Sequence, residues 1–236
     1  MSYLIFMVLA FVAAGISSRL LPSPFPLPKR ERLFVGLVGF SGAAIAAKLP
    51  FLILDEDLLH SAGTLLFSGK TILMGLVGGY AGVELAKWRL GITTKTGDHF
   101  VVPVAVGIGV GRLGCFFGGC CYGTATDVPW GVVFPSVDAM ARHPTQIYEC
   151  VFHVVMAFIS YGMLRDGILR GQLFKIYLLS YFAYRFLTEF IRPEIQWSFG
   201  LTAYQWAIML LSPVFVWLLL RDRFGRSSFE KEIVKT

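Results

Sequence analysis

The chain has 236 residues, of which 56% are hydrophobic and 15% charged, whereas soluble domains carry roughly 25% charged residues. Apolar surface on this scale would aggregate in water, so a soluble enzyme, a nucleic-acid-binding protein and a disordered tail are excluded. Four cysteines are too few for a disulfide scaffold, and the net charge of +6 is read first for membrane orientation. The composition indicates an integral membrane protein.

Apolar stretches of about the length that a helix needs to cross a bilayer recur along the whole chain. None is an amphipathic stripe, most are apolar on all sides, and they lack the alternation of a membrane β-barrel. The sequence therefore predicts an all-α polytopic membrane protein, with one domain over residues 1–236. Prolines at every second position of residues 21–28 predict an extended cytoplasmic linker. About seven transmembrane helices are expected, at residues 2–18, 33–54, 72–88, 100–119, 147–164, 173–191 and 201–220.

Lysine and arginine gather in alternate loops. Fourteen of the 21 basic residues follow the first, third and fifth predicted spans or lie in the C-terminal tail. By the positive-inside rule these segments are cytoplasmic, so the N-terminus is predicted outside and the C-terminus in the cytoplasm. No basic residue precedes the first span, which is the reverse of a secretory signal and predicts that this span is retained.

Ionisable residues inside a span are costly, so each one is treated as a site hypothesis. Tyr181, Arg185 and Glu189 recur every four residues and share one helix face, and Arg192 follows near the outer end. One interpretation is a structural ion pair between Arg185 and Glu189. The other is a site in which arginine grips a lipid phosphate with two parallel hydrogen bonds.

Residues 107–123 contain seven glycines, with Arg112 among them. Gly107 and Gly111 predict close contact between helices. Gly118 and Gly119 instead predict backbone that leaves the helix and turns inside the protein. The segment is thus expected to be irregular and to carry a polar site around Arg112.

The segment 142–149 enters the fifth predicted span, and Pro144 is typical of a helix start. Glu149 and His153 are four residues apart and lie on one helix face. His143, at the outer surface, is a candidate general base. His153 is more consistent with a buried histidine whose hydrogen bonds are satisfied.

Cys115, Cys120 and Cys121 leave several interpretations open: small residues in a tight turn, a reactive thiol, or a metal site. The C-x-x-C spacing of zinc sites is absent, and adjacent cysteines are unfavourable for chelation, so no metal is predicted. No cofactor is expected either. A non-catalytic thiol- or metal-binding membrane protein using these cysteines is the alternative function. A small transporter is disfavoured because no internal repeat is visible.

Several motifs occur together in a fixed order. They are Gly111-Arg112-x-Gly114, Tyr122-Gly123, residues 129–135 and 142–149, Tyr181-x-x-x-Arg185-Phe186-x-x-Glu189-Phe190-x-Arg192, and Gly200-Leu201-Thr202 with Gln205. In their order and spacing, over about residues 69–220, the chain resembles the bacterial prolipoprotein diacylglyceryl transferase family. Seven spans with an outer N-terminus agree with that resemblance.

The resemblance implies a transferase of the bacterial cytoplasmic (inner) membrane. It would move a diacylglyceryl group from phosphatidylglycerol, or a similar anionic phospholipid, to the lipobox cysteine of a prolipoprotein, releasing glycerol phosphate. Arg112 and Arg185 would contact the phosphate and stabilise the leaving group electrostatically, with Glu189 and Tyr181 as their positioned partners and His143 as a further catalytic candidate. The expected substrate-binding residues are Gly78, Gly79, Gly114, Cys120, Gln146, Tyr148, Glu149 and Arg192.

Two departures from the family pattern concern the acceptor. Val77 stands before Gly78-Gly79 where the family has a histidine, which removes a convenient base for a thiol. Residues 114–120 read Gly-Cys-Phe-Phe-Gly-Gly-Cys where the family has Gly-Asn-Phe-x-Asn-Gly-Glu. The arginines expected to bind the phospholipid donor are kept, and the residues expected to serve the acceptor are changed. We therefore infer a divergent member of the family whose acceptor can differ.

Overall fold

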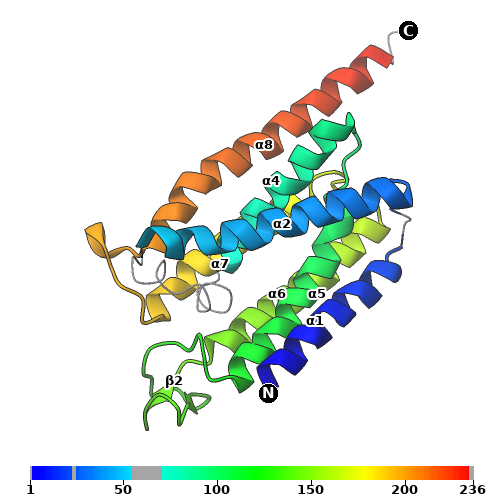
Figure 1. The fold of residues 1–236 in the computed structure, drawn as a ribbon. Helices are drawn as coiled ribbons and strands as arrows, with labels where there is room; N and C mark the ends of the chain where they lie inside the picture. The colour runs from blue at the N-terminus through cyan, green and yellow to red at the C-terminus, as the bar shows by residue number, and fades with distance from the viewer. Residues whose placement is uncertain (1, 23–24, 55–70, 234–236) are drawn as a thin grey trace. The chain divides into compact units, whose positions relative to one another are not determined.

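The computed structural model describes residues 2–22, 25–54 and 71–233. They form two compact units, which are described separately: Met1–Ser23 with Gly97–Thr236, and Pro24–Thr96. Among the described residues, the larger unit contains five long helices and a two-stranded hairpin, and the smaller unit contains two long helices (Figure 1).

Each predicted span coincides with a helix, so the mostly helical fold is confirmed. Within the described residues, four helices are long and apolar enough to cross a bilayer: Lys29–Pro50, Asp98–Phe117, Thr145–Arg165 and Ala203–Asp222. The count of seven spans, their orientation and the single domain stay predictions. The elements are α1 (Ser2–Arg19), α2 (Lys29–Leu54), α4 (Ile72–Leu90), α5 (Asp98–Phe117), α6 (Thr145–Arg165), α7 (Leu173–Thr188) and α8 (Ala203–Ile233), with β1 (Val132–Val133), β2 (Ala141–Arg142) and the 3-10 turns η2 (Glu189–Ile191) and η3 (Ser198–Gly200).

In the smaller unit, α2 and α4 pack antiparallel through glycine. A Cβ added at Gly42 would lie 2.5 Å from the Gly78 carbonyl oxygen, and one at Gly82 would lie 2.6 Å from the Val38 oxygen. Only residues without a side chain allow two helix backbones to approach so closely. The other small residues along this contact are Gly39, Ala43, Ala46, Ala47, Gly75 and Gly79.

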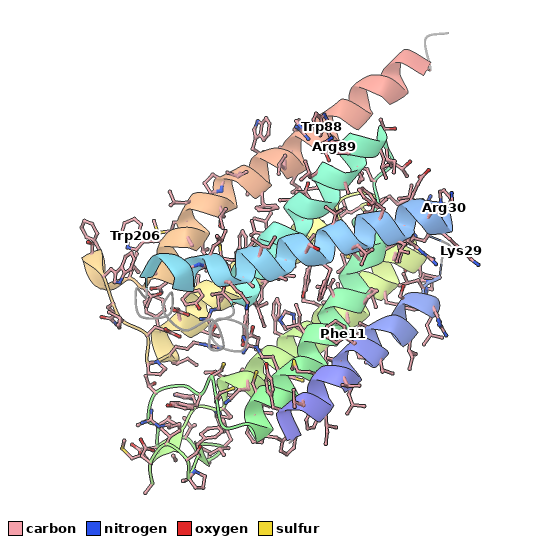
Figure 2. The ribbon with its side chains drawn as sticks, in the orientation of Figure 1. Phe11, Lys29, Arg30, Trp88, Arg89 and Trp206 are labelled. Atoms are coloured by element: carbon pink, nitrogen blue, oxygen red, sulfur yellow. The ribbon has the colours of Figure 1, made fainter. Side chains whose placement is uncertain are left out.

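The antiparallel pairing brings basic residues of the smaller unit to one end. Figure 2 shows Lys29 and Arg30 at the start of α2, on the same side of the helix pair as Trp88 and Arg89 at the end of α4. Both groups belong to segments that the positive-inside rule assigns to the cytoplasm.

In the larger unit, the neighbouring helices also run antiparallel. A Cβ at Gly107 of α5 would lie 3.4 Å from Ala14 of α1, and the ring centroids of Phe182 and Phe215 lie 5.7 Å apart between α7 and α8. The close helix contact predicted at Gly107 is thus confirmed. This alternation brings the start of α1, the end of α5, the start of α6 and the end of α7 to one end of the unit (Figure 1).

At the opposite end of this unit, charged side chains fix the helix ends. Asp98, at the start of α5, accepts hydrogen bonds from the backbone N–H groups of Gly171 and Leu173, the latter at 3.0 Å, and so holds the first turn of α7. Lys175 of α7 and Asp222 of α8 form a largely buried ion pair of 2.6 Å.

Backbone leaves the helix after Phe117, as the glycines predicted. Gly119 has φ +68° and Cys121 has φ 62°, a left-handed conformation that is uncommon for a residue with a side chain. The loop then forms the β1–β2 hairpin, in which Val132 pairs with Arg142. Pro144 precedes α6 as expected of a helix start.

Candidate functional site

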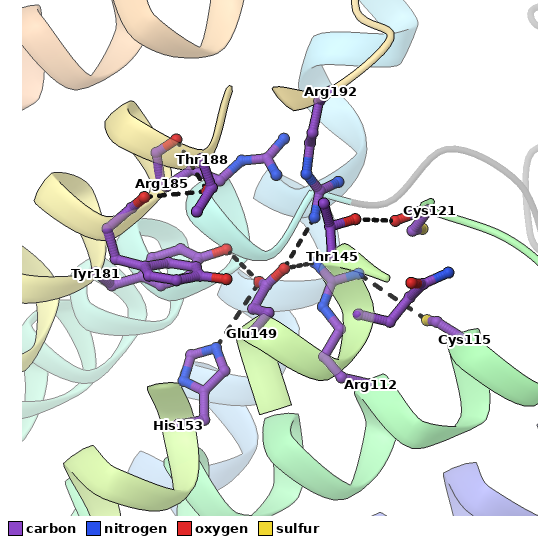
Figure 3. A network of polar contacts seen from close by, with 12 residues as sticks. Arg112, Cys115, Cys121, Thr145, Glu149, His153, Tyr181, Arg185, Thr188 and Arg192 are labelled. Carbon is purple, nitrogen blue, oxygen red and sulfur yellow. Dashed lines mark hydrogen bonds and ion pairs between the residues drawn. The ribbon is translucent and has the colours of Figure 1, made fainter. Parts of the chain in front are cut away.

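Glu149, fully buried in the second turn of α6, is the centre of a charged cluster (Figure 3). Its Oε2 lies 2.7 Å from Nη2 of Arg112 on α5 and 3.0 Å from Nη2 of Arg192, which follows η2. Its Oε1 accepts a hydrogen bond of 2.7 Å from the hydroxyl of Tyr181 on α7. A buried carboxylate is tolerated only when it is paired in this way.

A second buried ion pair lies at the end of α7. Nη2 of Arg185 is 2.8 Å from Oε2 of Glu189, and Thr202 donates a hydrogen bond of 2.9 Å to Oε1 of the same carboxylate. The Arg185 guanidinium also lies over the Tyr204 ring, 4.5 Å from its centroid. The ion pair suggested by the sequence is therefore present, and it fixes the orientation of Arg185.

The three arginines keep hydrogen-bond donors to spare. In the part of the chain that the structure describes, Nε of Arg112, Nη1 of Arg185 and Nε of Arg192 are buried and have no hydrogen-bond partner. Three guanidinium groups meet the two carboxylates of Glu149 and Glu189, which leaves one positive charge in excess. Buried donors and charges are normally satisfied, so this arrangement favours an anionic ligand.

Aromatic side chains of α6 and α7 stand beside the cluster. Tyr181 and Tyr184 stack with ring centroids 6.2 Å apart, and Phe152 stacks on Tyr184 at 4.4 Å. His153 is fully buried, and its Nδ1 lies 2.9 Å from the Tyr177 hydroxyl. The histidine is buried, as the sequence favoured, but its Nε2 has no hydrogen-bond partner among the described residues and lies 3.8 Å from Oε1 of Glu149, so its hydrogen bonds are only partly satisfied. Tyr177 was missed, although it lies four residues before Tyr181 and extends the same series.

His143 belongs to a different group. Its Nδ1 lies 3.2 Å from the hydroxyl of Tyr148, which accepts a hydrogen bond of 2.7 Å from Nε1 of Trp130. The structure thus joins two of the predicted site residues to each other, on the hairpin side of α6. Their roles as catalyst and ligand contact stay predictions.

The first turn of α6 holds the glycine-rich loop. The Thr145 hydroxyl donates to the carbonyl of Cys121, and Nε2 of Gln146 donates to the carbonyl of Cys120, both at 2.6 Å. Gln146 was predicted to bind substrate, and in the structure its amide positions the loop.

The cysteines that the sequence left open lie together. The sulfur atoms of Cys115, Cys120 and Cys121 are all within 4.8 Å of one another, and Nη1 of Arg112 lies 4.0 Å from Cys115 Sγ. Hydrogen bonds from the thiols of Cys115 and Cys120, together with the charges of Arg112 and Arg192, lower the pKa of Cys121. The same thiol contacts raise the pKa of Cys120.

The predicted glycine positions lie at helix contacts. Gly78 and Gly79 belong to the smaller unit, where a Cβ at Gly79 would lie 3.4 Å from the Ala43 side chain. Gly114 lies against α1, and a Cβ there would lie 2.8 Å from Phe6. A Cβ would be crowded at Gly114, and also at Gly78, where it would lie 2.5 Å from the Gly42 oxygen, whereas at Gly79 it would make ordinary van der Waals contact. A role of these glycines in substrate binding stays a prediction.

Comparison with known proteins identifies related sequences. The family described as prolipoprotein diacylglyceryl transferase matches residues 1–221. Proteins named phosphatidylglycerol–prolipoprotein diacylglyceryl transferase are 38% identical over 157 residues in Methylobacillus flagellatus (62% of this chain and 60% of the relative) and 30% identical over 201 residues in Clostridium tetani (81% of each). The one from Vibrio vulnificus is 36% identical over 166 residues, which is 67% of this chain and 61% of the relative. The matched part thus spans about three fifths of the length of two of these relatives.

Proposed function

Because this chain belongs to the prolipoprotein diacylglyceryl transferase family, we propose that it transfers a diacylglyceryl group from phosphatidylglycerol to a thiol acceptor. The acceptor proposed first is the lipobox cysteine of a prolipoprotein, and glycerol phosphate is the second product. The names of the relatives from Methylobacillus flagellatus and Clostridium tetani support both substrates.

The proposal that phosphatidylglycerol is the lipid donor rests on guanidinium N–H groups that have no hydrogen-bond partner. Nε of Arg112, Nη1 of Arg185 and Nε of Arg192 are buried and unpaired among the described residues, and the cluster has one positive charge in excess. A phosphodiester carries one negative charge and several acceptor oxygens. It would satisfy both the charge and the donors.

The same arrangement suits the proposed reaction. The acceptor sulfur forms a bond to the glyceryl carbon, and the bond from that carbon to the phosphate oxygen breaks. The electron pair leaves with glycerol phosphate, so the headgroup gains negative charge as the bond breaks. Arginines that are already fixed by Glu149 and Glu189 stabilise that charge without first reorganising.

The membrane placement is part of the proposal. All seven helices would span the bacterial cytoplasmic membrane, with the N-terminus outside and the C-terminus in the cytoplasm. The antiparallel packing of the larger unit supports this, because the loop after Phe117 and the turn after Thr188 lie at the end that the start of α1 occupies. Basic residues of α2 and α4 gather at one end of the smaller unit, as cytoplasmic ends should.

The experiment is to reconstitute the protein in vesicles that contain phosphatidylglycerol labelled in the headgroup, with a lipobox peptide as acceptor. The native protein should release labelled glycerol phosphate. Arg112→Ala and Arg185→Ala should each lower the rate at least about 100-fold. Arg165→Ala is the matched control, because Arg165 is exposed and pairs with Asp166 at the other end of α6. It should stay within about twofold of the native rate.

Thermal unfolding in detergent accompanies each assay, because loss of Arg112 leaves the Glu149 carboxylate with one fewer buried partner. Arg112→Lys keeps the positive charge and replaces Arg112→Ala as the test variant if Arg112→Ala does not fold. Equal release by all variants, or no release by the folded native protein, would refute the proposed donor chemistry.

The identity of the acceptor is tested separately. Val77 replaces the family histidine, so rescue of a bacterial strain that lacks its own transferase should be weak or absent if the acceptor has changed. Full rescue would establish a prolipoprotein acceptor.

The alternative of a non-catalytic thiol-binding protein is not better supported. It predicts that Cys120→Ser with Cys121→Ser abolishes function while Arg185→Ala is tolerated.

A further inference from the structure

The loop after α5 gathers three thiols that the donor chemistry does not use. Cys115 comes from the last turn of α5, and Cys120 and Cys121 come from the turn that follows. Their sulfur atoms lie within 4.8 Å of one another, although they are separated in sequence by four residues and by none. We propose that these thiols bind a thiophilic divalent cation of the zinc class and leave one coordination position open for the acceptor thiol.

The distances fit a three-sulfur site. With zinc–sulfur bonds of about 2.3 Å, ligand sulfurs lie about 4 Å apart. The three sulfurs, with separations of at most 4.8 Å, need to move by less than about 1 Å to reach this arrangement. Thiolates are ligands that select zinc and the softer metals over magnesium and calcium.

The loop is held in the shape that brings the thiols together. Cys121 has a left-handed backbone, and its sulfur lies within 4.8 Å of the sulfurs of Cys115 and Cys120. The carbonyls of Cys120 and Cys121 are fixed by Gln146 and Thr145 of α6, each at 2.6 Å. These hydrogen bonds are the kind of supporting contact that orients metal ligands.

The surrounding charges also favour thiolates. Nη1 of Arg112 lies 4.0 Å from Cys115 Sγ, so a cationic group faces the cluster. Three thiolates with a divalent cation carry one net negative charge, and the Arg112 guanidinium, which also pairs with Glu149, lies beside it. Figure 3 shows Arg112 lying between the Glu149 cluster and Cys115.

The number of thiols leaves a coordination position free. Within the described residues, the group of possible ligands contains three thiols, and Cys120 and Cys121 are exposed. Three protein ligands with one open position are typical of a catalytic zinc site, whereas structural sites are closed by a fourth. A thiol that binds a metal is deprotonated outright. The metal would therefore replace the base that this chain lacks, because Val77 stands where the family has a histidine.

This assignment of the fourth ligand rests on the proposed function. The acceptor thiol would lose its proton to solvent on binding the cation, and its sulfur would then form the bond to the glyceryl carbon. The carbon–oxygen bond breaks and glycerol phosphate leaves with the electron pair. Because Arg112 contacts both Glu149 and Cys115, the two halves of the reaction would meet at this residue.

The test begins with metal binding alone, on the full-length protein in detergent under reducing and anaerobic conditions. Titration with Cd²⁺ should give one equivalent of a thiolate-to-cadmium charge-transfer band. Cys115→Ser, Cys120→Ser and Cys121→Ser should each weaken binding at least about tenfold. Cys150→Ser is the matched control, because Cys150 lies on α6 outside the group, and it should leave affinity unchanged. No band, or equal loss in all four variants, would overturn the site.

The open position is tested with Co²⁺, whose visible spectrum reports its ligands. A lipobox peptide should shift and intensify the spectrum, and the same peptide with serine in place of its cysteine should not. If both peptides act alike, the fourth-ligand assignment is wrong. A protein that binds Cd²⁺ and releases no glycerol phosphate refutes the proposed function alone, and an active protein without the band refutes the metal site alone.

Discussion

The α2–α4 contact of the smaller unit and the α5–α6–α7 contact of the larger unit differ in kind. In the smaller unit, α2 and α4 meet backbone to backbone at Gly42, Gly78 and Gly82. In the larger unit, α5, α6 and α7 are joined by side chains, through Arg112, Glu149 and Tyr181. We expect the first contact to be disrupted by added volume and the second by loss of charge. The smaller unit thus relies on close backbone packing, and the larger unit on buried paired charges.

The largest expected effect is in the charged region. Glu149→Gln should lower transferase activity at least about 100-fold, because Arg112 and Arg192 lose the carboxylate that fixes them. The free energy of unfolding should fall by about 3 kcal/mol, the scale for breaking a buried ion pair. Labelled glycerol phosphate release and denaturant unfolding measure the two effects. Asp166→Asn, which changes an exposed ion pair, should alter neither the activity nor the free energy of unfolding. Equal effects of the two variants would contradict a special role of the buried charges.

The next effect is in the packed region. A Cβ at Gly78 would lie 2.5 Å from the Gly42 oxygen and would also meet the Ala46 side chain, so Gly78→Val should destabilise the protein by at least about 2 kcal/mol. Gly36→Val is the matched control on α2, because a Cβ at Gly36 meets nothing within 4 Å among the described residues. Thermal unfolding in detergent compares the two. Equal midpoints would show that this glycine contact does not hold the helices together.

The smallest expected effect is at Tyr177 and tests whether His153 belongs to the charged cluster around Glu149. Tyr177→Phe removes the hydroxyl that contacts His153 and should cost about 1 kcal/mol of stability, with little change in the rate of transfer. Tyr161→Phe, on the exposed face of α6, is the control and should cost less. A large loss of activity in Tyr177→Phe, with stability intact, would extend the reactive cluster to His153.

Much of this arrangement could be predicted from local sequence. Apolar length gave the helices, Gly118 and Gly119 gave the irregular loop, and the four-residue spacing of Arg185 and Glu189 gave their ion pair. Each of these depends on residues close together in the chain. The glycines and alanines of α2 and α4 recur with similar spacing, and this pattern could have revealed their contact.

Contacts that depend on folded loops could not be predicted. Arg192 follows η2 in extended backbone, and only the turn of the chain there returns its guanidinium to Glu149. Tyr181 was expected to be the partner of an arginine, and its hydroxyl instead donates to Glu149 of α6, because a carboxylate accepts hydrogen bonds and a guanidinium does not. The cluster of three thiols includes Cys121, whose left-handed backbone could not be predicted from two adjacent cysteines in the sequence.

The glycine-rich loop and the segment before Arg192 are tied together by their main chains. Gly123 donates to the His143 carbonyl at 2.8 Å, and Thr124 donates to the Ile191 carbonyl at 2.9 Å, one residue before Arg192. A Cβ at Gly123 would lie 2.6 Å from that same Ile191 oxygen. The main chains of the loop and of the segment before Arg192 therefore fix each other, and under the proposed function this would couple acceptor preference to phospholipid binding. If the proposed function holds, we expect a change of nucleophile to need residues 189–192 exchanged together with the loop, because the two segments share these hydrogen bonds.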